Sequence, residues 1–179
     1  TVDFIPTLLD FYNSRYGGDL RFEDITSFRL WEVGLGKTLD EAIMIIHAFY
    51  ASEFYERISF VKDARESILR LCEDNEGSFI SARYSVVKGR TNRFLGNEFP
   101  KTQVFYSKNY SEPGKTKAEI CRELGIEIMV EDESNTAVEC HESGIRTLLL
   151  NKPRNQESNG KVERVYNWRE ILEKIKKGN

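Results

Sequence analysis

The chain has 179 residues, of which 40% are apolar and 31% are charged. This is enough for one domain with a hydrophobic core, or for one domain with a small insertion. Lysine and arginine number 26 against 29 aspartates and glutamates, so the net charge of −3 gives no electrostatic argument for a nucleic-acid polymer or a membrane as partner. The longest apolar runs, such as residues 42–46, are far shorter than the roughly 20 residues of a membrane span.

The cysteines indicate a compartment rather than a site. Cys72, Cys121 and Cys140 form an odd set without CxxC spacing. Neither a zinc site nor a disulfide framework is therefore predicted. A reducing, cytoplasmic location is the simplest interpretation.

The first third of the chain is predicted to be helical. Apolar residues recur at helical spacing up to Tyr16, and Gly17-Gly18 ends that helix. Thr38 followed by Glu41 is a capping-box pair that opens a second helix. A third helix is expected over about 62–73.

After Gly77 the pattern changes to short apolar runs that alternate with helical segments. Strands are expected near 78–81, 103–107, 126–130 and 145–150. Helices are expected near 86–99, 115–124 and 135–142, and from about 167 onward, with a surface loop over 151–161. Strands separated by segments of helical length indicate βαβ units, so we predict an α/β fold with a parallel sheet flanked by helices.

Ligands of a parallel sheet bind beyond the carboxyl ends of its strands. This rule selects Ser81 and Arg83 after the first strand, Ser107-Lys108 after the second, residues 131–133 after the third and Asn151-Lys152 after the fourth. Adjacent carboxylates after an apolar strand suit Mg²⁺, which prefers oxygen ligands. Hydroxyls and lysines beside Mg²⁺ suit a phosphate, whose charge they can bind and neutralise.

Each of these residues also has a purely structural interpretation. Residues 131–133 fit a polar loop whose last acid caps the helix that begins at Asn135, and Ser81 fits a turn hydroxyl or an N-cap. Lys115 and Lys117 fit solvated lysines at a helix start. Lysines there oppose the helix dipole, however, and a nearby anion would remove that conflict.

Three segments together resemble motifs of the haloacid-dehalogenase (HAD) superfamily. Phe79-Ile80-Ser81-Ala82-Arg83 resembles the second motif, a strand that ends in Ser or Thr. Gly114-Lys115-Thr116-Lys117-Ala118-Glu119 is similar to the third, which places a lysine at a helix start. Ile128-Met129-Val130-Glu131-Asp132 resembles the fourth, with Glu-Asp in place of the more frequent Asp-Asp. The resemblance covers residues 60–179, and features nearer the N-terminus are similar to the branch of 5′(3′)-deoxyribonucleotidases.

The first HAD motif, D-x-D-G-[TV], does not occur in the 179 residues. It carries the nucleophilic aspartate and the aspartate that acts as general acid and base. In the family it lies on a strand about ten residues before a helix like that at residues 4–16, so it is expected upstream of Thr1. Asp3 has neither a strand before it nor an Asp two positions later. The alternative is a homologue without the nucleophile.

The resemblance implies Mg²⁺-dependent hydrolysis of a phosphomonoester through an aspartyl-phosphate. Its substrate would be a small phosphorylated molecule such as a nucleoside monophosphate. The implied roles are phosphoryl binding by Ser81, charge neutralisation by Lys115 with Lys117 as the second choice, Mg²⁺ ligation by Asp132 and Glu131, and substrate binding by Arg83 and Lys117.

The resemblance also implies a division of the chain. Residues 1–14 and 61–179 would form the α/β core, with a Rossmann-like sheet, and residues 15–60 a helical cap that closes over the substrate. Phe28 and Trp31 in that cap fit either stacking on a nucleobase or a small apolar core. Two alternatives stay open: a HAD phosphatase or phosphomutase acting on a sugar phosphate, and a catalytically silent HAD-like binding domain. The oligomeric state is left open.

Overall fold

The computed structural model describes residues 1–156 and 160–177. Its α-helices are α1 (Phe4–Tyr16), α2 (Leu39–Ala51), α3 (Ala64–Asp74), α4 (Lys88–Glu98), α5 (Lys117–Leu124), α6 (Ser134–Glu142) and α7 (Trp168–Lys177). Its strands are β1 (Ser78–Ser81), β2 (Gln103–Tyr106), β3 (Ile128–Glu131), β4 (Arg146–Leu150) and β5 (Glu163–Val165). Short 3₁₀ helices are η1 (Phe22–Asp24), η2 (Leu30–Val33), η3 (Glu53–Arg57), η4 (Ser85–Val87) and η5 (Pro153–Asn155).

All strand pairs in these ladders are parallel, which confirms the predicted α/β class. β1 pairs with β2, and β3, β4 and β5 form a second group in that order. The sequence did not predict β5, because two adjacent charged residues, Glu163 and Arg164, precede its single buried apolar residue, Val165. Part of the predicted 151–161 loop lies outside the described residues, and η5 occupies its first half.

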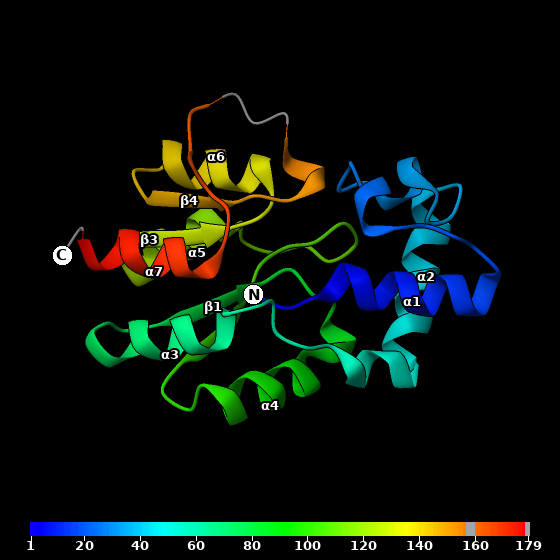
Figure 1. Ribbon diagram of the computed structural model, residues 1–179, viewed down its shortest axis with the longest axis horizontal. Coiled ribbons are helices and arrows are strands. Elements are labelled where there is room, and N and C mark those ends of the chain that lie inside the picture. The colour runs from blue at the N-terminus through cyan, green and yellow to red at the C-terminus, as the bar shows by residue number, and fades with distance from the viewer. Residues whose placement is uncertain (157–159, 178–179) are drawn as a thin grey trace.

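Helices cover both faces of the strands. On one face α3 and α7 pack together, with Ile68 from α3 and Ile171 from α7 in the same buried cluster as Leu148 of β4. On the other face α5 and α6 bury Cys121 and Cys140 against the strands. Figure 1 shows these layers, with the helices α1 and α2 set to one side of them.

The segment from α1 to η3, residues 4–58, forms a helical unit whose buried cluster also includes Tyr84 and Val87, which follow β1. Leu8 and Phe11 of α1 pack with Ile45 and Phe49 of α2 in one buried cluster. The predicted division assigned residues 1–14 to the α/β core, whereas α1 packs here with the helices that follow it. Among the described residues, no helix is both long enough and apolar enough to span a membrane.

The strands are incompletely covered between the two groups. Residues Phe79 and Ile80 of β1 and Ile128 to Val130 of β3 are only half-buried, although they are apolar. Residues 147–150 of β4, which has a strand on each side, are buried. β1 and β3 each have one partner strand, and the first residues of the chain lie between the two groups (Figure 1). In the described residues, one edge of β1 and one edge of β3 are thus left without a neighbouring strand.

Candidate active site

Within each group the strands are parallel, so their carboxyl ends lie at one edge of that group. We call the residues that end or follow β1, β3 and β4 the rim. Ser81 is the last residue of β1, Glu131 is the last of β3, and Lys152 and Arg154 follow β4. The rim is where the sequence predicted a site, and its side chains divide into distinct environments.

Glu131 is held in a buried, fully bonded position. Its side chain is 3% exposed, and Oε2 accepts a hydrogen bond from the Lys117 ammonium at 2.5 Å. Oε1 accepts hydrogen bonds from the backbone N–H groups of Asp132 and Glu133 at 2.9 and 3.1 Å. Burial raises the pKa of the Glu131 carboxyl, and Lys117 and the Asp132 amide oppose that shift. The carboxylate therefore fixes both the lysine and the turn that follows β3.

Lys117, rather than Lys115, is brought to the rim. Thr116 is the N-cap of α5 and Glu119 completes a capping box, so the helix begins at Lys117. Burial alone would lower the pKa of Lys117, but the charge of Glu131 raises it, so the ammonium form is favoured. Lys115 lies before the cap, where its exposed side chain pairs with Glu123 at 2.6 Å. The structure thus brings Lys117, the second choice from the sequence, to the acids, and leaves Lys115, the first choice, apart from them.

Asp132 is the rim acid that is open to solvent. Its side chain is 36% exposed, and one oxygen pairs with the guanidinium of Arg154. Burial would raise the pKa of Asp132, but the charges of Arg154 and Lys117 hold it below its ordinary value. An ionised carboxylate with solvent access is the type of ligand that Mg²⁺ takes.

Glu133 has the structural role that the sequence left open. Its carboxylate accepts hydrogen bonds from the N–H groups of Asn135 and Thr136 at 3.0 and 2.6 Å, and it is the N-cap of α6. The three consecutive acids therefore have three roles: Glu131 holds Lys117, Asp132 is open, and Glu133 caps a helix.

Ser81 and Arg83 follow β1 but point into different surroundings. Ser81 Oγ accepts a hydrogen bond from the Arg83 N–H at 3.2 Å, as in a turn. The Arg83 guanidinium donates to Tyr55 and to Thr91, at 3.3 Å each. Arg83 thus connects β1 to η3 of the helical unit and to α4, away from Glu131 and Asp132 in the contacts it makes.

Sequence reasoning missed Arg154 and Asn155. Asn155 is 1% exposed and donates to the carbonyls of Asp132 and Leu150, so it fixes η5 against the turn after β3. The signal was available, because both residues closely follow the carboxyl end of β4. A polar loop rich in Asn, Pro and Ser concealed it.

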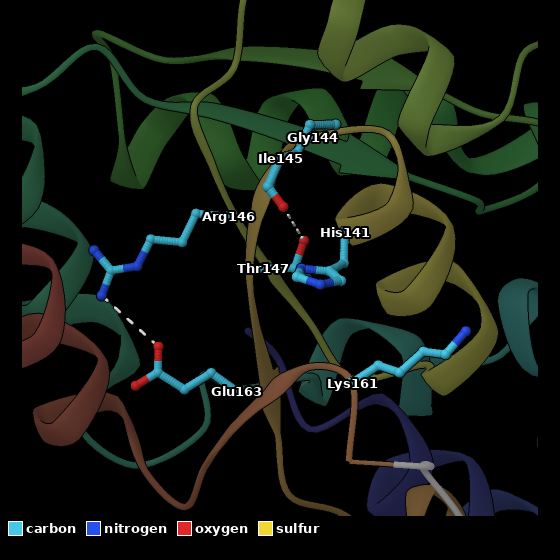
Figure 2. Close-up of a pocket in the computed structure, with 7 residues that line it drawn as sticks. All are labelled: His141, Gly144, Ile145, Arg146, Thr147, Lys161 and Glu163. Carbon is cyan, nitrogen blue, oxygen red and sulfur yellow. Dashed lines mark hydrogen bonds and ion pairs between the residues drawn. The ribbon is translucent and has the colours of Figure 1, made fainter.

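Two surface hollows of the described residues lie away from Glu131 and Asp132. One hollow, of about 450 Å³, lies at the amino end of β4 and is lined by His141, Arg146, Lys161 and Glu163 among others. Figure 2 shows the ion pair between Arg146 and Glu163 at its edge. Another, of about 430 Å³, lies on α5 beside Lys115. Parallel sheets bind ligands at the opposite ends of the strands from the first hollow.

The donor set fits one part of a magnesium site. In the described ranges, no three acids, cysteines or histidines are grouped so that they could hold a metal. The open carboxylate of Asp132 is one suitable oxygen ligand, while both oxygens of Glu131 are already bonded. Mg²⁺ commonly uses only one or two protein carboxylates together with water and substrate phosphate.

A family model describes residues 1–178 of this chain: 5′ nucleotidase, deoxy (pyrimidine), cytosolic type C protein. The chain belongs to this family. It is therefore a hydrolase of the HAD phosphatase class, as the resemblance of its three motifs implied.

Individual relatives agree with the family. A nucleotidase of Clostridium acetobutylicum is 24% identical over an alignment of 185 residues that covers 95% of this chain and 89% of the relative. A HAD-like hydrolase of Streptococcus pneumoniae has a TM-score of 0.69 at 12% identity, covering 97% of this chain and 92% of its own. Protein tyrosine kinase A of Mycobacterium tuberculosis has a TM-score of 0.73 at 15% identity, with the same two coverages. At such identities the structures show the shared fold, which hosts more than one activity.

Proposed function

We propose that the protein is a Mg²⁺-dependent phosphomonoesterase that acts on nucleoside monophosphates through an aspartyl-phosphate. The observation that carries the proposal is the buried Lys117–Glu131 pair next to the open carboxylate of Asp132, at the carboxyl ends of parallel strands. A lysine, a metal-ligating acid and a strand-end hydroxyl are the groups that phosphoryl transfer requires for charge neutralisation and positioning.

The nucleophile is proposed to lie upstream of Thr1, on a strand that runs between β1 and β3. The unpaired edges of those strands and the half-exposure of their apolar residues support this position. The first residues of the chain lie between the two strand groups (Figure 1), and burial lowers the pKa of the Thr1 amino group while the Asp132 and Glu131 carboxylates oppose that shift. A strand directly before Thr1 would deliver its last residues to the rim.

Each rim residue then has a defined task. Lys117 neutralises charge on the attacking aspartate and on the phosphoryl oxygens, and Glu131 keeps the ammonium charged and in place. The Ser81 hydroxyl donates a hydrogen bond to a phosphoryl oxygen. Asp132 holds the metal, which when bound supplies Lewis-acid polarisation of the phosphoryl group. Arg83 is proposed to bind substrate indirectly, by fixing the helical unit that acts as the cap.

The reaction has two steps, and its atoms and protons balance with the substrate and water alone. The upstream aspartate attacks phosphorus, and the ester oxygen leaves with a proton from the second Asp of D-x-D. Water then attacks the aspartyl-phosphate, gives its proton to that same Asp, and releases phosphate. We include a cytoplasmic location in the proposal, which the three free cysteines support.

The test is phosphate release by the full-length protein from a panel of nucleoside monophosphates and sugar phosphates, with Mg²⁺ and with EDTA. The proposal expects release from nucleoside monophosphates that EDTA abolishes and Mg²⁺ restores. Faster release from sugar phosphates would contradict nucleoside monophosphates as the substrate class and favour sugar phosphates instead. Equal rates in EDTA would contradict the metal-dependent mechanism.

A further inference from the structure

Aromatic residues of the helical unit contact the α/β part around the rim. The Phe22 ring lies 5.8 Å from the Lys152 ammonium, and the Phe28 ring lies 4.7 Å from the Arg154 guanidinium carbon. Trp31 meets Tyr110, of the loop after β2, edge-to-face with ring centroids 5.8 Å apart. Phe28 and Trp31 are not members of the helical unit's buried cluster. Phe28 and Trp31 thus contact residues across the boundary rather than the helical unit's buried cluster, and stacking of either ring on a nucleobase stays a prediction.

Arg154 contacts both sides of that boundary. Its side chain is only 9% exposed, although it carries a permanent charge. It pairs with Asp132 on the α/β side and lies over Phe28 on the helical side, while its buried Nε has no hydrogen-bond partner among the described residues. A guanidinium suits this position, because its flat face can stack on a ring while its edge binds a carboxylate.

The backbone segment that carries Arg154 is held in place by the hydrogen bonds of its neighbour in sequence. Asn155, the next residue, is buried and bonded to the carbonyls of Asp132 and Leu150. Arg164 of β5 donates to both the side chain and the carbonyl of Asn155. A short, anchored segment thus presents the guanidinium, and a displacement of Phe28 or Asp132 would cost it a contact.

We propose that Arg154 is a positioning residue that holds the helical unit against the rim, with Asp132 and Phe28 as its two contacts. We call this set of three residues the Arg154 bridge. The bridge has a consequence for metal binding that rests on the proposed function. Mg²⁺ and Arg154 compete for the Asp132 carboxylate, so metal binding loosens the helical unit and, by linkage, a loosened unit binds metal more tightly.

The experiment measures amide hydrogen exchange in the full chain after EDTA treatment, so that no metal contributes. The reporters are amides of the helical unit near Phe28, such as Ile25 and Leu35, which donate within the unit. Arg154→Met keeps the length of the side chain and removes its charge. We expect exchange of these reporters to be roughly three- to tenfold faster, the effect of losing one partly desolvated cation–ring contact.

Further variants separate the bridge from general damage. Asp132→Asn and Phe28→Leu are expected to accelerate the same reporters, and Phe28→Leu added to Arg154→Met is expected to add little, since both remove one contact. Amides of residues 148–150 in β4 are the internal reference, because global unfolding would accelerate them in parallel. Arg57→Met is the matched control: Arg57 also lies over a ring, Phe54 at 4.5 Å, but within the same short helix η3.

Exchange of the reporters in Arg154→Met within twofold of wild type, or the same acceleration in β4, would overturn the bridge. Titration calorimetry with Mg²⁺ then tests the competition, for which we expect roughly fivefold or more tighter binding in Arg154→Met. Weaker or unchanged binding would overturn it. A wild-type protein that binds no Mg²⁺ would contradict the metal in the proposed function, whereas the metal-free exchange would still decide the bridge.

Discussion

Lys115 and Lys117 differ by two positions and carry the same charged group, yet the fold separates them. Lys117 is 17% exposed and bonded to the buried Glu131, whereas Lys115 is 58% exposed and paired with Glu123. An exposed ion pair contributes at most about 1 kcal/mol, and a buried one that loses a partner leaves a charge without compensation. The two lysines therefore give a matched pair of variants.

We predict that Lys117→Met lowers kcat of the full-length enzyme by roughly 10²-fold or more, since it removes a charge aimed at the phosphoryl group. Lys115→Met should leave kcat within about twofold and the unfolding free energy within about 0.5 kcal/mol. Phosphate-release kinetics and urea unfolding measure both effects. The reverse order of activities would show that Lys115 is the catalytic lysine.

Loss of folding in Lys117→Met would obscure its kinetics, because Glu131 would be left buried and unpaired. The double variant Lys117→Met with Glu131→Gln removes both charges and should recover much of the stability. Its activity should stay low. Recovery of activity together with stability would mean that Lys117 acts on the fold and not on the reaction.

The Asp132–Arg154 pair predicts a pH dependence of stability. The charge of Arg154 helps to hold the pKa of Asp132 below the ordinary value in the folded protein. The pair's contribution to the free energy of unfolding is therefore complete above about pH 3.9, and it is lost as the pH falls through the lowered pKa. In Arg154→Met the carboxyl loses that support. The difference in unfolding free energy between wild type and variant should be largest near neutral pH and should shrink toward pH 2 in urea titrations. A difference that does not change with pH would mean that the pair contributes no charge interaction.

One topological rule led from the sequence to most of the candidate site residues. Ser81, Glu131 and Asp132 all end or follow a strand, and an apolar run shows where a strand ends. The choice between Lys115 and Lys117 could not be made in the same way, since it depends on which residue caps α5. Arg154 was missed because its partners, Asp132 and Phe28, are distant in sequence, and its position shortly after β4 was concealed in a polar loop.

At the scale of elements, the start of α5 determines which lysine faces the rim. Thr116 accepts a hydrogen bond from the Glu119 N–H at 3.1 Å, and Glu119 accepts one from the Thr116 N–H at 2.7 Å. Because this box fixes the first helical residue as Lys117, fraying it would displace the ammonium from Glu131. Small displacements of positioned groups cost catalysis more than they cost stability.

We predict that Thr116→Ala lowers the unfolding free energy by about 1 kcal/mol and also lowers kcat, by roughly tenfold. Thr38→Ala is the matched control, because Thr38 caps α2 through the Glu41 N–H at 3.2 Å and that helix start is remote from Lys117 in sequence. It should have the same stability cost with kcat unchanged. Equal kinetic effects of the two variants would show that the cap of α5 has no special role.

The elements that the sequence predicted are the ones with strong periodic or apolar patterns. The capping pair at Thr38 and the apolar runs of β1 to β4 were found within a few residues. β5 was missed because Glu163 and Arg164 resemble a loop until pairing with β4 makes them a strand. The packing of α1 with the helical unit was missed because an amphipathic helix does not reveal which surface it meets.

At the scale of the molecule, the parallel strands form two groups that share one core. Phe79 of β1 and Val130 of β3 both border the buried cluster around Leu148. The facing edges of β1 and β3 have no partner strand in the described structure, and unpaired strand edges with apolar residues are unfavourable in water. A strand in that position would pair both edges and cover the half-exposed residues.

We therefore predict that the protein with its upstream strand is more stable than residues 1–179 alone. Covering the exposed half of a few apolar side chains contributes about 1 kcal/mol each, so the melting temperature should differ by roughly 10 °C. Hydrogen exchange gives a more specific test. The edge amides of β1 and β3, around Ile80 and Met129, should become protected from exchange while amides of β4 change little. A longer chain whose β1 and β3 amides exchange as fast as those of residues 1–179 would contradict the proposed strand, and with it the position of the nucleophile between Ser81 and Asp132.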